Sequence, residues 1–147
     1  MKSWLPLIAL TLTPTSAIAG ILPTTMINGK PLPGSVQDLT NQVVLFDQET
    51  TNGKRVIAIR GTRLQGTRTP IHIHEHGGIT CIISGEITDF VENHPVKTYG
   101  PGDCYYMPAN TPMAAYNSGN SPTILIDIFT LPDNADLMTI IEPKDVP

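Results

Sequence analysis

Three of the four histidines of the chain lie close together in the segment 70–76. Side chains alternate between the two faces of a β-strand, so His72 and His74 are expected to point the same way, and His76 joins them if the strand continues. Imidazole is the commonest metal ligand in proteins, and two neighbouring imidazoles can share one ion. The spacing predicts a metal site at His72 and His74, the alternative being solvated histidines on an exposed strand. The fourth histidine, His94, falls in an expected turn.

Short strands joined by turns must position these histidines. The 14 Pro and 12 Gly of the 147 residues leave little uninterrupted length for long helices, while a hydrophobic fraction of 40% can fill a core. Seven or eight strands of ordinary length indicate a sandwich or barrel, and short helical turns are conceivable at 35–41 and 133–138. The strands are expected at residues 43–46, 55–60, 70–74, 79–83, 86–92, 104–107, 113–117 and 123–129.

The residues around the histidines resemble the two motifs of the cupin superfamily. Gly66, the pair His72 and His74, and Gly85 have the spacing of the first cupin motif, and residues 102–117 fit the second motif except at one position. The resemblance implies an all-β fold with a single cupin jelly-roll barrel, also described as a double-stranded β-helix.

The ligand set that the resemblance implies is incomplete in this chain. Metal-binding cupins typically use two His and a Glu from the first motif and one His from the second, but here the Glu position falls on Gly78 and the last His position on Met113. A thioether can coordinate soft ions such as Cu(I). We therefore expect one metal ion held by His72, His74 and Met113, with His76 able to replace the missing Glu; the alternative for Met113 is core filling. This set favours copper, with iron, manganese, nickel and zinc as alternatives.

Three tyrosines and a carboxylate near the motifs complete the candidate pocket. Tyr105, Tyr106 and Tyr116 could line it, because a buried tyrosine combines an apolar ring with a hydroxyl that needs a partner. Alternation allows at most one of Tyr105 and Tyr106 to face inward. Glu75 is expected on the rim, pointing away from the histidines. Only His76 is evident as a general base in the pocket.

The first nineteen residues have the pattern of a secretory signal peptide. Lys2 gives a positive start, a short apolar stretch follows, and Ala17-Ile18-Ala19 matches a cleavage site. Cleavage before Gly20 predicts a protein that is periplasmic or secreted. Export permits a disulfide between Cys81 and Cys104, the alternative being small buried thiols, which are common in such strands.

The remaining chain is expected to form one domain. An N-terminal arm with the first strands is expected at 20–65, the barrel core with both motifs at 66–130 and a C-terminal arm at 131–147. The net charge of −4 argues against a nucleic-acid partner, and the short, interrupted apolar stretch at 1–19 argues against a membrane span. The resemblance implies a homodimer in which the arm at 20–40 adds to the sheet of the partner.

Three functions are compatible with these features. The favoured one is an exported protein that binds a metal ion, with copper preferred, or a small ligand in its barrel. The second, implied by the resemblance, is a metalloenzyme of the dioxygenase, isomerase or lyase type acting on a small organic substrate. The third is a metal-free barrel that binds a small molecule. The fold alone does not choose among them.

Overall fold

The structure is a computed structural model that describes residues 20–144, so the expected signal peptide lies outside the described residues. The described part contains β-strands, turns and irregular segments and no helix. This confirms the expected all-β class. Within it, no helix is long and apolar enough to cross a membrane.

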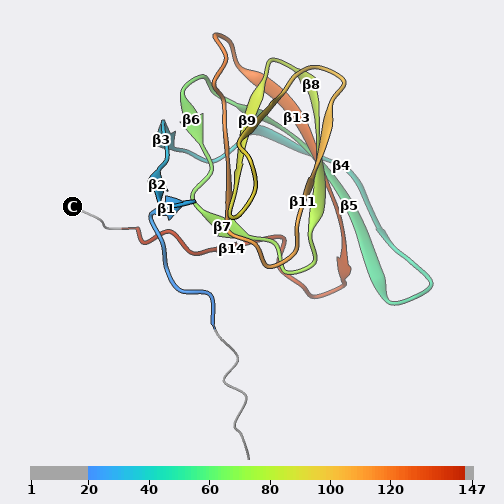
Figure 1. Cartoon of the computed structure of the whole chain (residues 1–147). Coiled ribbons are helices and arrows are strands. Elements are labelled where there is room, and N and C mark those ends of the chain that lie inside the picture. The colour runs from blue at the N-terminus through green and yellow to red at the C-terminus, as the bar shows by residue number, and fades with distance from the viewer. Residues whose placement is uncertain (1–19, 145–147) are drawn as a thin grey trace, which may run out of the picture.

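Two β-sheets face each other and enclose the core (Figure 1). The first sheet contains β4 (Thr40–Glu49), β5 (Lys54–Arg63), β8 (Gly78–Ser84), β11 (Cys104–Met107) and β13 (Thr123–Pro132). The second contains β3 (Ser35–Val36), β6 (Thr67–Arg68), β7 (His72–Ile73), β9 (Ile87–Val91), β10 (Lys97–Tyr99), β12 (Met113–Tyr116) and β14 (Thr139–Ile140). The first sheet has the order β11-β8-β13-β5-β4. The second follows β10-β9-β12-β6-β3, with β7 between β12 and β14. A separate hairpin is formed by β1 (Met26–Ile27) and β2 (Lys30–Pro31).

A strand overlaps each expected range, but the range 70–74 is reduced to β7 at residues 72–73, and both expected helical turns are wrong. Residues 35–36 form β3, which pairs in parallel with β6, and residues 133–138 form a turn and irregular chain. The backbone amides of Ser35 and Gln37 donate to the carbonyls of Gly66 and Arg68. These hydrogen bonds to a distant segment satisfy the backbone better than one isolated helical turn, which is costly to nucleate.

The main core fills the space between the two sheets. Its buried apolar side chains alternate with outward-facing ones along the strands, as expected for strands covered on one face. The core includes Ile57, Ile82, Ile87, Val91, Leu125, Phe129 and Leu131. A smaller core of Ile27, Ile71 and Ala114 joins the N-terminal arm to the second sheet of its own chain.

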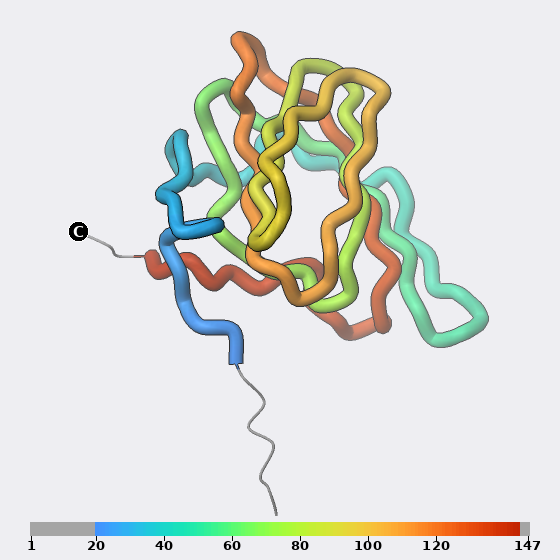
Figure 2. The backbone as a smooth tube through the Cα atoms, in the orientation of Figure 1, coloured from blue at the N-terminus to red at the C-terminus, as the bar shows by residue number. Residues whose placement is uncertain are grey.

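The C-terminal segment crosses one end of the barrel, beside β7 (Figure 2). β14 pairs with β7, placing Ile140 opposite His72. Arg68 forms an ion pair of 2.7 Å with Glu142, and the Glu142 carboxylate also accepts a hydrogen bond of 2.8 Å from the Ile71 amide. The segment therefore closes the barrel next to the histidines.

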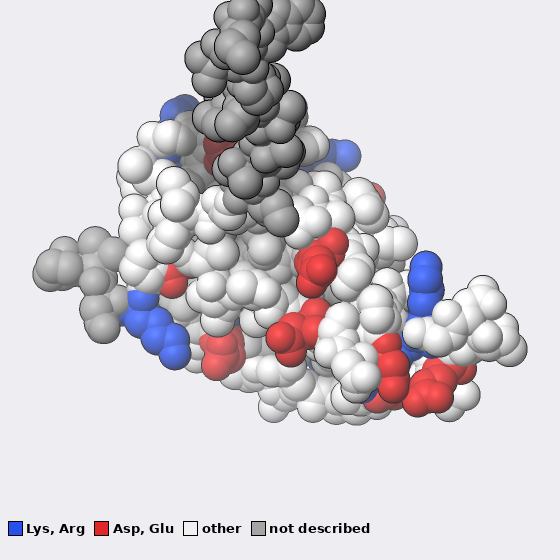
Figure 3. Space-filling model, turned by 90° about the horizontal axis from the view of Figure 1, so that it is seen from below, with Lys and Arg blue, Asp and Glu red and all other residues white. Residues whose placement is uncertain are grey.

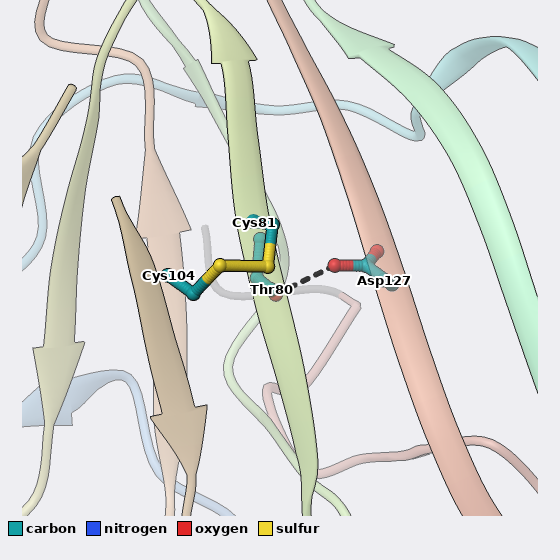
Figure 4. The surroundings of a disulfide bond; sticks show 4 residues. All are labelled: Thr80, Cys81, Cys104 and Asp127. Carbon is teal, nitrogen blue, oxygen red and sulfur yellow. Dashed lines mark hydrogen bonds between the residues drawn. A yellow bond between two sulfur atoms is a disulfide. The ribbon is translucent and has the colours of Figure 1, made fainter. Parts of the chain in front are cut away.

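Cys81 and Cys104 form a disulfide between facing positions of β8 and β11 (Figure 4). Thr80 and Tyr105, their immediate neighbours, are buried on the opposite side of the sheet. The bridge therefore lies on the outer surface of the first sheet and leaves the barrel interior free.

The face of the molecule seen in Figure 3 carries small groups of acidic and basic side chains separated by uncharged surface. No basic stripe runs across the described residues in this view. The distribution agrees with the net charge of −4 and offers no phosphate-binding track on this face.

Candidate functional site

The barrel holds a cavity of about 160 Å³ lined by both sheets and by both terminal segments. Apolar contributions include Leu39, Phe129 and Leu137, and the polar ones come from histidine, aspartate, tyrosine and arginine side chains. A protein cavity of about 150 Å³ accepts a molecule the size of benzene. This cavity can therefore hold a small organic ligand.

His72 and His74 lie on the wall of this cavity and turn the same nitrogen toward each other. Both are buried, with exposed fractions of 5% and 4%, and the His72 Nε2 atom is 3.1 Å from the His74 Nε2 atom. His72 Nδ1 lies 2.8 Å from the Pro70 carbonyl oxygen, and His74 Nδ1 lies 2.6 Å from that of Leu137. A carbonyl oxygen only accepts, so each Nδ1 carries the hydrogen. In the neutral rings both Nε2 atoms then present lone pairs to each other.

Burial keeps these rings neutral. Burial, followed by the proximity of His74, lowers the pKa of His72 to about 4. Burial also lowers the pKa of His74. Neutral imidazole is the form that binds a metal ion. Because neither ring readily takes a proton near pH 7, the facing lone pairs are best satisfied by a cation between them.

The spacing of the two nitrogens fits ligands of one metal ion. Metal–nitrogen bonds of about 2.0–2.1 Å place two adjacent ligand nitrogens about 2.9–3.3 Å apart, which brackets the observed 3.1 Å. Met113 is buried, lines the cavity and faces His72 in the register of β12 and β7. The described residues contain no group of three or more His, Cys, Asp or Glu side chains that could hold a metal. The cavity wall thus offers the two imidazoles and, as soft donors, the thioethers of Met107 and Met113.

The structure does not bring His76 to this pair. Its side chain is 32% exposed, lies 4.0 Å from the Glu75 carboxylate and is not part of the cavity wall. The Glu75 side chain is 70% exposed and does not line the cavity. His94 lies in an exposed turn, as expected.

Phe129 and Met107 fill the space beside Gly78. A Cβ atom added at Gly78 would lie 2.7 Å from two ring carbons of Phe129 and from the terminal carbon of Met107. The Phe129 ring also packs against His74, with ring centroids 5.0 Å apart. An apolar aromatic group thus occupies the room that a glutamate at position 78 would need.

A layer of polar side chains lines the cavity next to the histidines. Tyr105, Thr80 and Asp127 face one another in register across β11, β8 and β13. The Thr80 hydroxyl donates to the Asp127 carboxylate at 2.6 Å (Figure 4). Asp89 enters the same cavity from β9 of the opposite sheet. Burial raises the pKa of Asp127 to about 6 and that of Asp89 to about 7.

These carboxyl groups correct the expectation that His76 is the only general base. Asp89 lies on the same strand face as the core residues Ile87 and Val91, and Asp127 on the same face as Leu125 and Phe129. The alternation that predicted the orientation of the histidines also contained this signal. A charged residue in phase with an apolar strand face indicates a polar group inside the barrel.

Arg63 supplies the positive charge of this layer. It is 2% exposed, and one guanidinium nitrogen donates to the Gln37 carbonyl oxygen while its Nε has no partner among the described residues. Burial lowers the pKa of Arg63, and the charge of Asp127 acts in the opposite direction. Arg63 and Asp127 thus offset each other in charge.

Only one of the three candidate tyrosines lines the cavity. Tyr105 is 6% exposed and faces inward, while Tyr106 is 62% exposed, as alternation predicts. Tyr116 lies on the other face of its sheet, where its ring packs against Gly34 of the N-terminal arm.

The fold and the site together define a class of protein, a small β-barrel with a cavity at its centre. Comparison with known proteins agrees with this barrel fold. Residues 62–129 match the family model described as Cupin domain, a range that contains both motifs. This match assigns a cupin domain to residues 62–129 of the chain. No curated protein matches the chain.

Solved structures share the double-stranded β-helix. The DMSP lyase DddQ from Ruegeria pomeroyi DSS-3 has a TM-score of 0.60 and 21% identity, covering 74% of this chain and 55% of that chain. A conserved protein with a double-stranded β-helix domain from Klebsiella pneumoniae has a TM-score of 0.55 and 23% identity, covering 74% of this chain and 91% of that chain. A cupin 2 domain-containing protein from Halorhodospira halophila has a TM-score of 0.57 and 15% identity, covering 71% of this chain and 70% of that chain. This chain therefore spans little more than half the length of the DddQ chain, and at these identities the likeness establishes the fold.

Proposed function

We propose that this protein binds one metal ion through His72 and His74 and holds a small organic ligand in the adjoining cavity. The observation that supports the proposal is the pair of Nε2 atoms 3.1 Å apart, each on a ring whose Nδ1 is already bonded to a carbonyl. The cavity of about 160 Å³ beside the pair supplies the ligand space.

We propose copper as the ion and Met113 as the third donor. Two imidazoles and a thioether suit a soft ion, whereas Fe(II) and Mn(II) prefer harder oxygen and nitrogen donors. The proposed export fits this choice, and the disulfide Cys81–Cys104 is of the kind found in oxidising compartments.

Metal content and metal titration test the proposal. The parent protein should carry one equivalent of metal, and the double variant His72→Ala, His74→Ala should carry none. His94→Ala is the matched control, because it removes an exposed histidine outside the cavity. Retention of the disulfide and of the β-sheet circular dichroism would show that the double variant is folded. A double variant that still binds one equivalent would refute the metal site.

A second substitution tests the thioether. Met113→Leu should keep the fold, because the two side chains have similar volumes, and should weaken Cu(I) more than Zn(II). A competition titration with a chromogenic chelator measures both affinities. Equal affinities in parent and variant would assign Met113 to the core alone.

A metalloenzyme acting on a small organic substrate is the second candidate function. The observation that favours it is the set of proton-transfer groups facing the cavity: Asp89, Asp127 and Tyr105. The structural neighbours include DMSP lyases, which makes DMSP a reasonable first substrate to test. Turnover by the metal-loaded protein that is lost in Asp89→Asn would support an enzyme. Absence of turnover together with stoichiometric metal would support the binding function.

We also propose a homodimer. Val43, Val44, Leu45 and Phe46 of the edge strand β4 are each roughly half exposed, which leaves an apolar edge available to a second copy. The N-terminal arm, by contrast, already pairs through β3 with its own barrel. Sedimentation equilibrium should give twice the monomer mass, and a monomer at all concentrations would contradict the proposal.

A further inference from the structure

Asp89 is a buried carboxyl group that faces the cavity without a hydrogen-bond partner. It is 7% exposed and lines the cavity wall, and none of the side-chain hydrogen bonds within residues 20–144 involves it. Buried polar groups are usually satisfied, since an unpaired one costs free energy. Asp127, the other cavity carboxylate, already has a hydrogen bond from Thr80 and the charge of Arg63 nearby. Asp89 is thus the acceptor that the fold leaves unused.

No cation of the described residues neutralises Asp89. No Lys, Arg or His nitrogen there lies within the ion-pair distance of its carboxylate. Lys97 is its registered neighbour on β10, but the Lys97 ammonium lies over the ring of Tyr99, 4.6 Å from the ring centroid. The His94 side chain lowers the pKa of Asp89 against the larger effect of burial, but it lies in an exposed turn and does not line the cavity. The space next to the Asp89 carboxylate inside the cavity can therefore accept a positively charged group of a ligand.

Aromatic rings stand close to this carboxyl group. Tyr105 lines the cavity and packs against Tyr99, with ring centroids 4.7 Å apart. Tyr99 is paired with Ile87, which lies two residues from Asp89 on the same face of β9, so the Tyr99 ring is a diagonal neighbour of the carboxyl group. A carboxylate beside tyrosine rings attracts an organic ammonium ion by charge and by cation–π interaction.

We propose that the cavity binds a small organic amine, with its ammonium group at Asp89 and Tyr105 and its apolar part against Leu39, Leu137 and Phe129. This deepens the small-ligand part of the proposed function and rests on it. The cavity volume of about 160 Å³ limits the ligand to roughly the size of benzene. A carboxylate ligand is disfavoured, because it would meet Asp89 with like charge and because the unpaired Nε of Arg63 is enclosed and has almost no accessible surface.

Three probes of equal chain length test the proposal: n-butylamine, n-butanol and butanoate. Each is titrated into the chelator-treated, metal-free protein and followed by amide chemical shifts in NMR spectra. n-Butylamine should bind at least tenfold more tightly than n-butanol or butanoate, with shifts at the amides of Asp89 and Ala115, which are paired across β9 and β12. Equal binding of the three probes, or tighter binding of butanoate, would overturn the proposal without any variant.

Asp89→Asn then assigns the preference to this carboxyl group. The variant keeps the side-chain shape and should lose the tenfold preference for the amine. Asp133→Asn makes the same chemical change on an exposed turn and should keep it. An unchanged preference in Asp89→Asn would overturn the assignment. Metal content is measured on separate, untreated parent protein, so the metal site and the amine site can fail independently.

Discussion

At the scale of single residues, position 78 decides which side chains the proposed metal site can contain. Phe129 and Met107 occupy the space that a side chain at Gly78 would enter. Gly78→Ala should therefore lower the free energy of unfolding by about 1–3 kcal/mol, the usual cost of overpacking a core. Gly100→Ala is the control, because a Cβ there meets nothing within 4 Å. Urea unfolding measures both, and a Gly78→Ala protein as stable as the control would contradict the packing described.

Protonation of Asp89 makes the stability of the fold depend on pH, and a variant at this position isolates that contribution. Its pKa is about 7 in the folded protein against 3.8 as the ordinary value, so the folded state binds the proton more tightly. The resulting stabilisation is complete below pH 4 and is lost as the pH rises toward 7. The Asp89→Asn variant does not lose this stabilisation. The free energy of unfolding of the variant minus that of the parent should therefore rise by about 2–4 kcal/mol between pH 4 and pH 8.

The difference between variant and parent must be measured, because other groups titrate in the same range. The lowered pKa of His72 makes stability fall as pH falls from 6.5 to about 4, which opposes the effect of Asp89. His72 and Asp127 are present in both proteins, so their contributions largely cancel in the difference. Thermal unfolding of parent, Asp89→Asn and the exposed control Asp133→Asn across this range provides the measurement. A difference in stability between Asp89→Asn and the parent that does not change with pH would show that the Asp89 carboxyl of the parent is exposed to water.

Residue-scale chemistry was predictable wherever strand alternation decides it. Alternation placed His72 and His74 on one face and Tyr105 opposite Tyr106, and the same rule applies to Asp89 and Asp127. The Leu137 carbonyl that bonds to His74 could not be predicted, because it comes from 63 residues away. Contacts of that separation depend on where the C-terminal segment folds back.

At the scale of elements, the C-terminal segment determines how the histidines are held. Glu142 accepts two hydrogen bonds of 2.7 Å from the Arg68 guanidinium and one from the Ile71 amide, and β14 pairs with β7 beside them. Leu137, earlier in the same segment, fixes the tautomer of His74 through its carbonyl. The ion pair and the orientation of His74, the proposed metal ligand, are therefore coupled through one segment of the chain.

Glu142→Gln tests this coupling. Loss of one partner of a largely buried ion pair should cost about 3 kcal/mol of stability. It should speed hydrogen exchange at the Ile141 amide, which donates to Ile71, and weaken metal binding by about tenfold through the altered support of His74. Asp47→Asn breaks the exposed pair with Arg55 and should change neither exchange nor metal binding. Unchanged metal affinity in Glu142→Gln would show that the segment does not support His74.

The short strands were the elements that sequence reasoning resolved least. Long strands such as β5 and β13 follow from their apolar alternation, whereas β3, β6 and β14 have two residues each. Their pairing partners are distant in sequence, so no local pattern marks them. The same strands close the barrel around the cavity, which is why the fold was easier to predict than the wall of the site.

At the scale of the whole molecule, the disulfide and the expected signal peptide make one joint prediction. A bridge on the outer surface of the first sheet persists where thiols are oxidised, and such compartments are reached by export. Protein recovered from the exported fraction should therefore begin at Gly20 and have the mass of residues 20–147 less two hydrogens. Intact-mass spectrometry before and after reduction measures both features, and the double variant Cys81→Ser, Cys104→Ser provides the control without a bridge. A product that retains residues 1–19, or that takes up a thiol reagent before reduction, would contradict export into an oxidising compartment and would remove the support that compartment gives to a copper site.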